Sequence, residues 1–418
     1  MSNERPAATG RTITLDRYAD CLDAYRSTAL RQALYDEGEV IMADVLVNLH
    51  GEPHRSRRRL ENRLFRRATY YHYEDEVFPQ IVEETMAPLV AAGRADLVHL
   101  GHALLLNLSA PAAGVDRIAG TPEETAHLLR LLMTFIEGAT LAHSTRDKNE
   151  VRREVLVALD EFDATFFAPA LERRRALLAR LAAGEVGEDD LPRDILTVLL
   201  RNQDDLELPR EVVRREVAFF LLAGAHTSAT ATTRTTHAIF EWIARHPEDR
   251  RRARSDLGFV QRCVHETVRL NPSSPIGLRW ALEDVRLASG VEIHAGDRVV
   301  FDLMSANRDE RVFGPSAADF DPFRSLPQDV ALYGLSFGSG THSCIGRDLA
   351  AGVLEDTVPG EKHLHGLVAI AVHGVLARGA RPDPHQAPTM DPHTRRPYWG
   401  TYPILLGDAS DDAGGGAS

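Results

Sequence analysis

Apolar residues recur every three or four positions along most of the chain, a spacing that predicts amphipathic helices. The longest such stretch runs from Pro209 to Arg245 and stops before Pro247, which cannot continue a helix. Residues 291–293 and 298–301 alternate in polarity around His294-Ala295-Gly296-Asp297 and predict a small hairpin. The other expected helices cover residues 52–67, 121–143, 148–181, 195–201 and 255–270. The fold class is therefore mainly α with a small β portion.

The composition of the chain excludes some classes of binding partner. The chain has 418 residues, with 48 Lys plus Arg and 61 Asp plus Glu, so its formal charge is 48 − 61 = −13. This balance argues against nucleic acid as the main partner. The three cysteines form no disulfide framework, and Met1–Thr14 lacks the apolar stretch of a signal peptide or membrane anchor. We expect a cytoplasmic protein without a membrane partner.

The domain organisation is expected to be simple. No linker or internal repeat divides the chain, so residues 15–406 are predicted to form a single domain. Residues 1–14 are expected to be a flexible N-terminus. Residues 407–418 are rich in Gly, Ala, Ser and Asp and are expected to be a disordered tail.

Cys344 is the most informative candidate for chemistry. Residues 337–346 read Phe-Gly-Ser-Gly-Thr-His-Ser-Cys-Ile-Gly, a glycine-rich loop that presents one thiol just before a predicted helix. The positive end of that helix favours an anionic sulfur. A lone cysteine is often only a small buried hydrophobe, which is the interpretation for Cys21 and Cys263. A dinucleotide-binding loop is disfavoured because Ser343 stands where its third glycine is needed.

The spacing Phe-x-x-Gly-x-His-x-Cys-x-Gly resembles the haem-ligand loop of the cytochrome P450 family. The resemblance implies the cytochrome P450 fold and a bound heme b (iron-protoporphyrin IX), with Cys344 as the metal ligand. It also places further residues of the loop around the cofactor. These are Phe337, Gly338, His342 and Gly346.

A second resemblance lies in the long helix, in the run Ala223-Gly224-Ala225-His226-Thr227-Ser228. The family uses small residues, here Ala223 and Gly224, beside the oxygen pocket, and a Thr hydroxyl, here Thr227, as a proton relay. Close packing of a buried helix is the alternative explanation of the same small residues.

His226 departs from the family pattern, which usually has Asp or Glu at this position. We hypothesise that His226 replaces the acid in proton delivery, because histidine can relay protons near neutral pH. A structural hydrogen bond to backbone or water is the alternative.

Two sets of charged residues complete the resemblance. Glu266 and Arg269 lie three apart on a helix face, and the family adds Arg324 to form a structural network. Cations must also hold the two propionates of a haem, although each could instead be a solvated charge. The candidates by resemblance are His54, Arg58, Arg279 and His342.

The helix that carries His54 is strongly basic within an acidic protein. A nucleic-acid patch is one interpretation, but the resemblance favours a docking face for an acidic ferredoxin. The basic residues are Arg55, Arg57, Arg59, Arg63, Arg66 and Arg67.

The resemblance implies an oxidoreductase, a monooxygenase that activates O2 and hydroxylates a small organic substrate. Electrons would come from NAD(P)H through an external ferredoxin and its reductase. A tailoring step in secondary-metabolite biosynthesis is expected. Candidate pocket residues by resemblance are Ala223, Ser274, Ile276, Gly277 and the loop 392–394.

Two alternatives to hydroxylation remain open at this point. One is an atypical haem-thiolate reaction, such as nitration, C–C or C–N coupling, desaturation or peroxide-driven oxidation. The other is a non-catalytic haem-containing recruitment module. Residues 357–362, which contain Pro359 and Gly360, are expected to interrupt the helix that follows Cys344. Residues 367–376 are its expected remainder.

Overall fold

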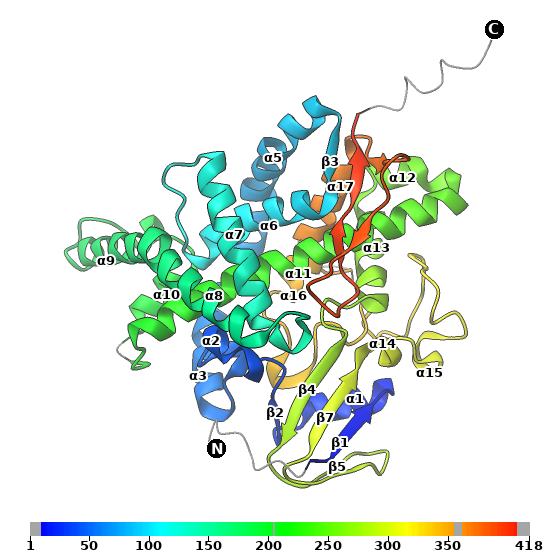
Figure 1. The fold of residues 1–418 in the computed structure, drawn as a ribbon, viewed down its shortest axis with the longest axis horizontal. Coiled ribbons are helices and arrows are strands. Elements are labelled where there is room, and N and C mark those ends of the chain that lie inside the picture. The colour runs from blue at the N-terminus through cyan, green and yellow to red at the C-terminus, as the bar shows by residue number, and fades with distance from the viewer. Residues whose placement is uncertain (1–9, 204, 355–361, 408–418) are drawn as a thin grey trace.

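The computed structural model describes residues 10–203, 205–354 and 362–407. A large helical body lies above a small sheet, and α11 (Arg210–Arg245) crosses the middle of the body (Figure 1). Residues 1–9 and 408–418, expected to be flexible, lie outside the described part. So do residues 355–361, which hold most of the expected interruption.

The helices agree with the mainly α prediction, and α10 has the predicted bounds. The stretch 148–181 is two helices joined by a wide π turn at Asp163–Phe167. The stretch 52–67 is shorter than predicted, because the chain leaves the helix after Glu61. The remaining helices are α1 Tyr18–Arg26, α2 Glu39–Met42, α3 Gly51–Glu61, α4 Arg67–Tyr71, α5 Phe78–Ala92, α6 Leu97–Ala113, α7 Pro122–Ala139, α8 Lys148–Phe162, α9 Ala168–Ala182, α10 Ile195–Arg201, α12 Arg250–Ser255, α13 Leu257–Leu270, α14 Leu303–Ala306, α15 Glu310–Phe313, α16 Arg347–Ala351 and α17 Leu367–Ala377.

The main sheet has four strands in the order β1-β7-β4-β2. These are β1 Thr12–Leu15, β7 Arg298–Asp302, β4 Ile276–Ala281 and β2 Leu30–Gln32. β1 runs parallel to β7, and the other pairs are antiparallel. The expectation that residues 1–14 are flexible is therefore wrong from Thr12 onward, because β7 supplies that strand with a hydrogen-bonded neighbour.

The predicted hairpin of residues 291–301 is also wrong. β6 (Glu292–Ile293) pairs with β5 (Val285–Arg286), whereas β7 lies between β1 and β4. The turn itself is present, because the Asp297 carboxylate accepts the backbone N–H of His294. The two flanking strands separate because each finds a partner elsewhere.

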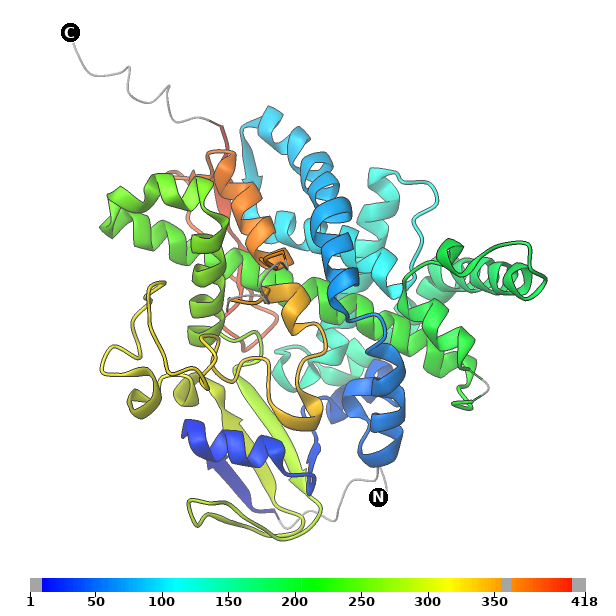
Figure 2. The ribbon, with the colours of Figure 1, turned by 180° about the vertical axis from the view of Figure 1, so that it is seen from behind.

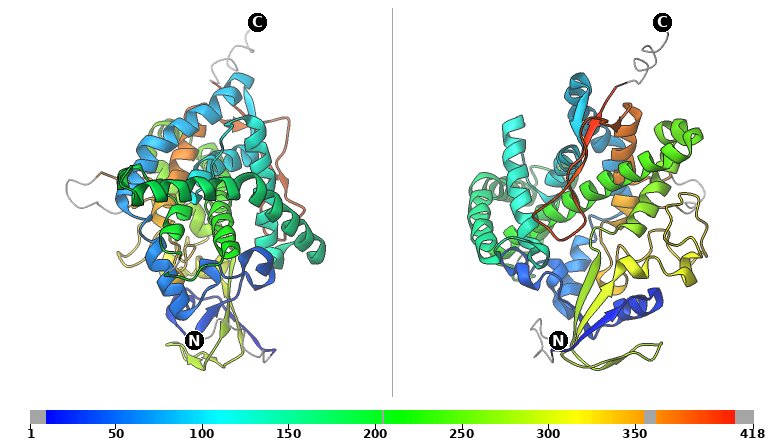
Figure 3. Two further views of the ribbon diagram at one scale, coloured as in Figure 1. Left: turned by 90° about the vertical axis from the view of Figure 1, so that its left-hand side faces the viewer. Right: turned by 45° about the vertical axis from the view of Figure 1, so that its right-hand side comes forward.

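The other strands form two small sheets near the C-terminus. β11 (Pro403–Leu405) pairs with both β3 (Arg94–Asp96) and β8 (Arg381–Pro382). β9 (Thr389–Met390) pairs with β10 (Trp399–Thr401). The right-hand view of Figure 3 shows this C-terminal segment, in red, running beside α11.

The core is built around α11 and α6, which pack closely through small residues. A Cβ on Gly101 of α6 would lie 3.3 Å from the carbonyl oxygen of Ala229 in α11. Seen from behind in Figure 2, the gold-to-orange segment that ends in α16 runs from beside the sheet into this body. Over the described residues, every helix is too short or too polar to cross a membrane.

Candidate functional site

The Cys344 loop is shaped by glycines in backbone conformations that other residues rarely adopt. Gly338 and Gly340 have φ values of 67° and 65°. A Cβ on Gly340 would lie 2.6 Å from the backbone oxygen of Tyr25. The loop closes where the Cys344 N–H donates to the Phe337 carbonyl at 2.8 Å, and α16 begins three residues later. The loop therefore holds the thiol at a fixed point before the helix.

The Cys344 thiol faces open space, whereas Cys21 and Cys263 are buried, as predicted. It still lies deep among protein atoms, and this burial raises the pKa of Cys344. The Gly346 N–H and the guanidinium groups of Arg58 and Arg347 oppose that rise in pKa. These groups would stabilise the thiolate form, which is the form that binds a metal.

Two histidines meet beside the loop with unused hydrogen-bonding atoms. The rings of His54 and His342 lie 4.2 Å apart between centroids. Burial lowers the pKa of His54 to about 4 and that of His342 to about 2, so both rings are neutral. Within the described residues, His54 Nδ1 and His342 Nε2 are buried without a hydrogen-bond partner. Buried polar atoms of this kind normally have one.

Two arginines lie in the same region. Arg279 is buried, donates to the Gln32 side-chain oxygen and the Leu278 carbonyl, and packs against the rings of Tyr25 and Phe301. Arg58 donates to Asn62 at 3.2 Å. Arg279 and Arg58 both act on the pKa of His342, which places them around this residue.

These donors fit the haem that the sequence implies. A haem needs one axial ligand and cationic or N–H partners for two propionates. The exposed thiol of Cys344 and the unpartnered nitrogens of His54 and His342 supply these two kinds of group. Arg58 and Arg279 add positive charge. Among the described residues, their hydrogen bonds go to neutral groups only, so this charge is available to a propionate. The residues present are therefore suited to hold a haem.

One face of α11 is exposed, although the helix is otherwise buried at this point. Gly224 and Thr227 are exposed although their neighbours Ala225 and Ser228 are buried. The Thr227 hydroxyl donates to the Ala223 carbonyl at 2.8 Å. A Cβ on Gly224 would lie 2.7 Å from the Ser109 hydroxyl of α6. Helix packing thus explains this glycine, in addition to the open face that the sequence predicted.

His226 points to a different side of α11 from Thr227. It is buried, and its Nδ1 lies 3.4 Å from His102 Nε2 of α6. Its ring also packs against Tyr398, at 5.4 Å between centroids. Successive helix positions differ by about 100° in direction, which separates the two side chains. His102 was missed by sequence reasoning, because nothing in the apolar α6 sequence marks it.

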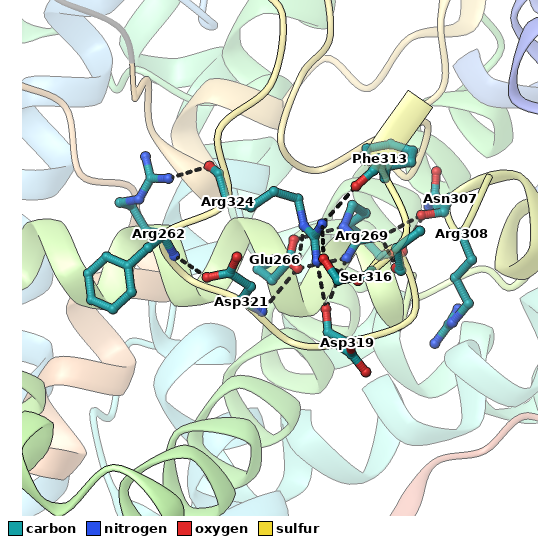
Figure 4. A network of polar contacts seen from close by, with 12 residues as sticks. Arg262, Glu266, Arg269, Asn307, Arg308, Phe313, Ser316, Asp319, Asp321 and Arg324 are labelled. Carbon is teal, nitrogen blue, oxygen red and sulfur yellow. Dashed lines mark hydrogen bonds and ion pairs between the residues drawn. The ribbon is translucent and has the colours of Figure 1, made fainter. Parts of the chain in front are cut away.

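The Glu266 network has the predicted members (Figure 4). Glu266 and Arg269 form a two-pronged pair at 2.6 and 2.7 Å, and Arg324 adds a bond at 3.0 Å. Glu266 and Arg269 are fully buried. Arg269 also donates to the carbonyls of Asn307 and Ala317. This network fixes the loop between α15 and the Cys344 loop against α13.

The basic surface of α3 is smaller than the sequence suggested. Arg57 is buried and pairs with Glu216 of α11 at 2.5 Å, so it belongs to the interior. Arg55 pairs with Glu52 on the surface. The other basic residues of this stretch are exposed, namely Arg59, Arg63, Arg66 and Arg67.

The candidate substrate-pocket residues do not all line one cavity. The loop 392–394 lines a cavity of about 690 Å³ that also contains His226. Ala223, Ser274, Ile276 and Gly277 are described residues that lie outside its wall.

Comparison with known proteins points to the same family as the residues of the site. The cytochrome P450 family profile matches residues 148–354. Cytochrome P450 52C1 of Candida tropicalis is 28% identical over 166 residues, which cover 34% of this chain and 32% of that protein. The chain matches between 32% and 52% of the length of the first three curated relatives. The chain belongs to the cytochrome P450 family.

Solved structures show the same fold along nearly the whole chain. The crystal structure of CalO2 has a TM-score of 0.71 and 20% identity, covering 94% of this chain and 90% of that one. The LnmA cytochrome P450 hydroxylase from the leinamycin biosynthetic pathway of Streptomyces atroolivaceus has a TM-score of 0.69 and 21% identity, covering 94% and 90%. The chain therefore has the cytochrome P450 fold that its sequence predicted.

Proposed function

We propose that the protein is a haem-thiolate monooxygenase that uses O2 to hydroxylate a small organic molecule. The observation that carries the proposal is the exposed Cys344 thiol beside unpartnered nitrogens of His54 and His342. When bound, a haem with a thiolate ligand supplies the activation of O2. The protein supplies the thiolate, the partners of the propionates and a path for protons.

Thr227 is the residue proposed to move protons. Its hydroxyl holds a proton that it donates to the Ala223 carbonyl at rest. The hydroxyl oxygen can also accept, so Thr227 can pass a proton to an acceptor on the open face of α11. Its carbonyl accepts a bond from the Ser273 hydroxyl at 3.3 Å, which ties this turn to the segment before β4.

For His226, the geometry favours the structural role over proton delivery. Its Nδ1 is engaged with His102, and burial lowers the pKa of His226 well below its usual value. A His226→Gln variant tests the choice. Unchanged coupling of oxygen consumption to product would support the structural role, whereas a loss of coupling with the protein still folded would support the relay.

The proposed electron supply is NAD(P)H through an external ferredoxin and reductase in the cytoplasm. The exposed arginines Arg59, Arg63 and Arg66 support a basic docking face for an acidic partner. The structural likeness to LnmA, a cytochrome P450 hydroxylase from the leinamycin biosynthetic pathway, supports a secondary-metabolite tailoring step for this chain.

Labelled oxygen tests the reaction type. A hydroxylase incorporates one atom from ¹⁸O2 into product, and the Thr227→Ala variant should lower the yield of product per O2 consumed. The Thr227→Ser variant, which keeps the hydroxyl, serves as the control. Product without the label would indicate coupling, desaturation or another atypical reaction. Haem incorporation without any substrate-dependent oxygen consumption would indicate a recruitment module.

A further inference from the structure

A second region of α11 faces a cavity whose wall is mainly apolar but also contains several polar and charged side chains. The cavity, of about 690 Å³, is lined by residues of α6, α7, α11 and the C-terminal segment 389–401. Thr227 and Gly224, on the open face of α11, are not part of its wall. The wall includes His102, His226, Arg234, Arg396, Tyr398 and Trp399.

The two histidines leave one hydrogen-bond acceptor in this wall. A backbone carbonyl only accepts, so the bond of 2.9 Å between His102 Nδ1 and the Val98 carbonyl places the His102 proton on Nδ1. His102 Nε2 then accepts, and the 3.4 Å contact assigns the donating N–H to His226 Nδ1. His226 Nε2 is left with a lone pair. It has no partner among the described residues, and the His226 side chain is 8% exposed.

Two buried arginines in the wall form hydrogen bonds only with neutral groups among the residues that the structure describes. Arg234 and Arg396 are each 7% exposed, and both pack on the Tyr398 ring, at 4.7 and 4.3 Å. Arg234 donates to the carbonyls of Asn271, Pro272 and Pro397. Its N–H groups are thus well occupied by backbone oxygens.

Arg396 is less completely occupied. Its Nη2 donates to the Thr140 hydroxyl at 3.0 Å, and its Nε lies 3.4 Å from the Thr394 hydroxyl. Both partners are neutral. A buried guanidinium without an anion is costly, and its planar fork is suited to a carboxylate.

The remaining charged groups of the wall are engaged elsewhere. Arg146 pairs with Glu137 at 3.0 Å and with Glu154 at 2.6 Å. Arg130 pairs with Glu161, and Asp391 accepts the His393 N–H at 2.8 Å. The rest of the wall combines apolar side chains, among them Val98, Met133 and Ile136, with uncharged serine and threonine side chains.

We propose that this cavity binds a small carboxylic acid that also carries a hydroxyl or amino donor and an apolar body. The carboxylate pairs with Arg396, the donor bonds to His226 Nε2, and the apolar part packs against α7. His226 and Arg396 both contact the Tyr398 ring, so the donor and the carboxylate lie on the same part of the ligand. The wall contains neither Thr227 nor any residue of the Cys344 loop, so the proposed site does not rest on the proposed reaction.

The test uses the haem-loaded protein and three probes: 3-phenyllactate, 3-phenylpropionate and methyl 3-phenyllactate. Calorimetry should show the tightest binding for 3-phenyllactate. Removing the hydroxyl or the charge should each weaken binding about tenfold, since a hydrogen bond to a buried partner contributes this much. Equal binding of the acid and its ester, or no binding at millimolar concentration, would overturn the proposal.

Single substitutions test which residue contacts which group of the ligand. Arg396→Gln should weaken 3-phenyllactate about tenfold and leave the ester unchanged, whereas the surface variant Arg286→Gln should leave both unchanged. His226→Phe should remove the preference for the hydroxyl. If Arg396→Gln does not fold, the preference of the wild-type protein for acid over ester still decides the question. The haem Soret band should not move on binding; a spin-state shift would place the occupant at the haem and contradict the site.

Discussion

The Glu266 network and the histidine pair beside the Cys344 loop differ in how their polar groups are satisfied. In the network, Glu266 accepts bonds from Arg269, from Arg324 and from the backbone N–H of Asp321. In the histidine pair, His54 Nδ1 and His342 Nε2 have no partner within the described residues. The protein completes its own network where it must be rigid, and it leaves donors unused where a cofactor fits.

The largest effect is expected where the network is complete. Glu266→Gln removes the only carboxylate among three residues and leaves Arg269 and Arg324 as buried charges without an anion. We expect a loss of about 3–5 kcal/mol in the free energy of unfolding, measured with urea. The surface variant Glu52→Gln should change it by less than about 0.5 kcal/mol. Equal effects of the two variants would contradict a structural role for Glu266.

Glu61 is a third case, a buried polar side chain that has no hydrogen-bond partner among the described residues and no proposed role in holding the haem. Both of its carboxylate oxygens are buried without a hydrogen bond to the described residues. Burial, together with the nearby Glu216 carboxylate, raises the pKa of Glu61 well above its usual 4.5. Burial also raises the pKa of Glu216, to about 7, but Glu216 accepts from Arg57 and from the Leu46 N–H, which favour its charged form over that of Glu61. A buried acid without partners is thus kept neutral by its proton.

This assignment has a definite sign. Below pH 4.5 Glu61 is protonated in both the folded and unfolded states, so it adds no pH dependence. As the pH rises, the unfolded chain releases this proton while the folded chain keeps it, and stability falls until the folded pKa is passed. Glu61→Gln should make the decline in unfolding free energy between pH 5 and pH 8 shallower. An unchanged decline would show that Glu61 is ionised in the folded protein.

The histidines beside the Cys344 loop are expected to affect the rate at which the holoprotein releases haem. His54→Leu removes a nitrogen that has no hydrogen-bond partner in the part of the chain that the structure describes, so the haem-free protein should lose little stability. The holoprotein should release haem about tenfold faster, because a propionate loses one hydrogen bond. Haem transfer to apomyoglobin measures the rate, with the partly exposed His72→Leu as control. An unchanged rate would remove His54 from the haem site.

The smallest effect is expected at Gly224. Alanine favours a helix over glycine by about 1 kcal/mol, but its Cβ would lie 2.7 Å from the Ser109 hydroxyl. These effects oppose one another, so Gly224→Ala should lower the unfolding free energy by only about 1 kcal/mol. Adding Ser109→Ala removes the clashing oxygen and should restore it. A double variant no more stable than Gly224→Ala would show that the glycine serves the open face instead.

The sequence predicted the residues whose roles depend on local spacing. The Cys344 loop, α10 and the pair Glu266–Arg269 follow from motifs within a few residues of each other, and all are confirmed as structural features. The hairpin of residues 291–301 failed because strand pairing is decided by distant partners, here β1 and β5. Sequence alone cannot weigh those competitors.

The direction of His226 could not be predicted for a related reason. Most of α11 is buried around its whole circumference, so the sequence pattern does not say which element each side faces. The contact with His102 and the cavity beside Arg396 arise only when α6, α7 and the C-terminal segment meet. Arg57 was likewise predicted to belong to a basic surface, because the sequence does not show that Glu216 lies beside it.

The central claim is that Cys344 is the axial thiolate of a bound haem. The most direct test is the absorption spectrum of the purified protein after reduction with dithionite and exposure to carbon monoxide. We predict the red-shifted Soret band of a thiolate-ligated carbonyl haem in the wild type and in Cys263→Ser, and its loss in Cys344→Ser. A band typical of neutral histidine ligation in the wild type, or a red-shifted band that persists in Cys344→Ser, would contradict the account.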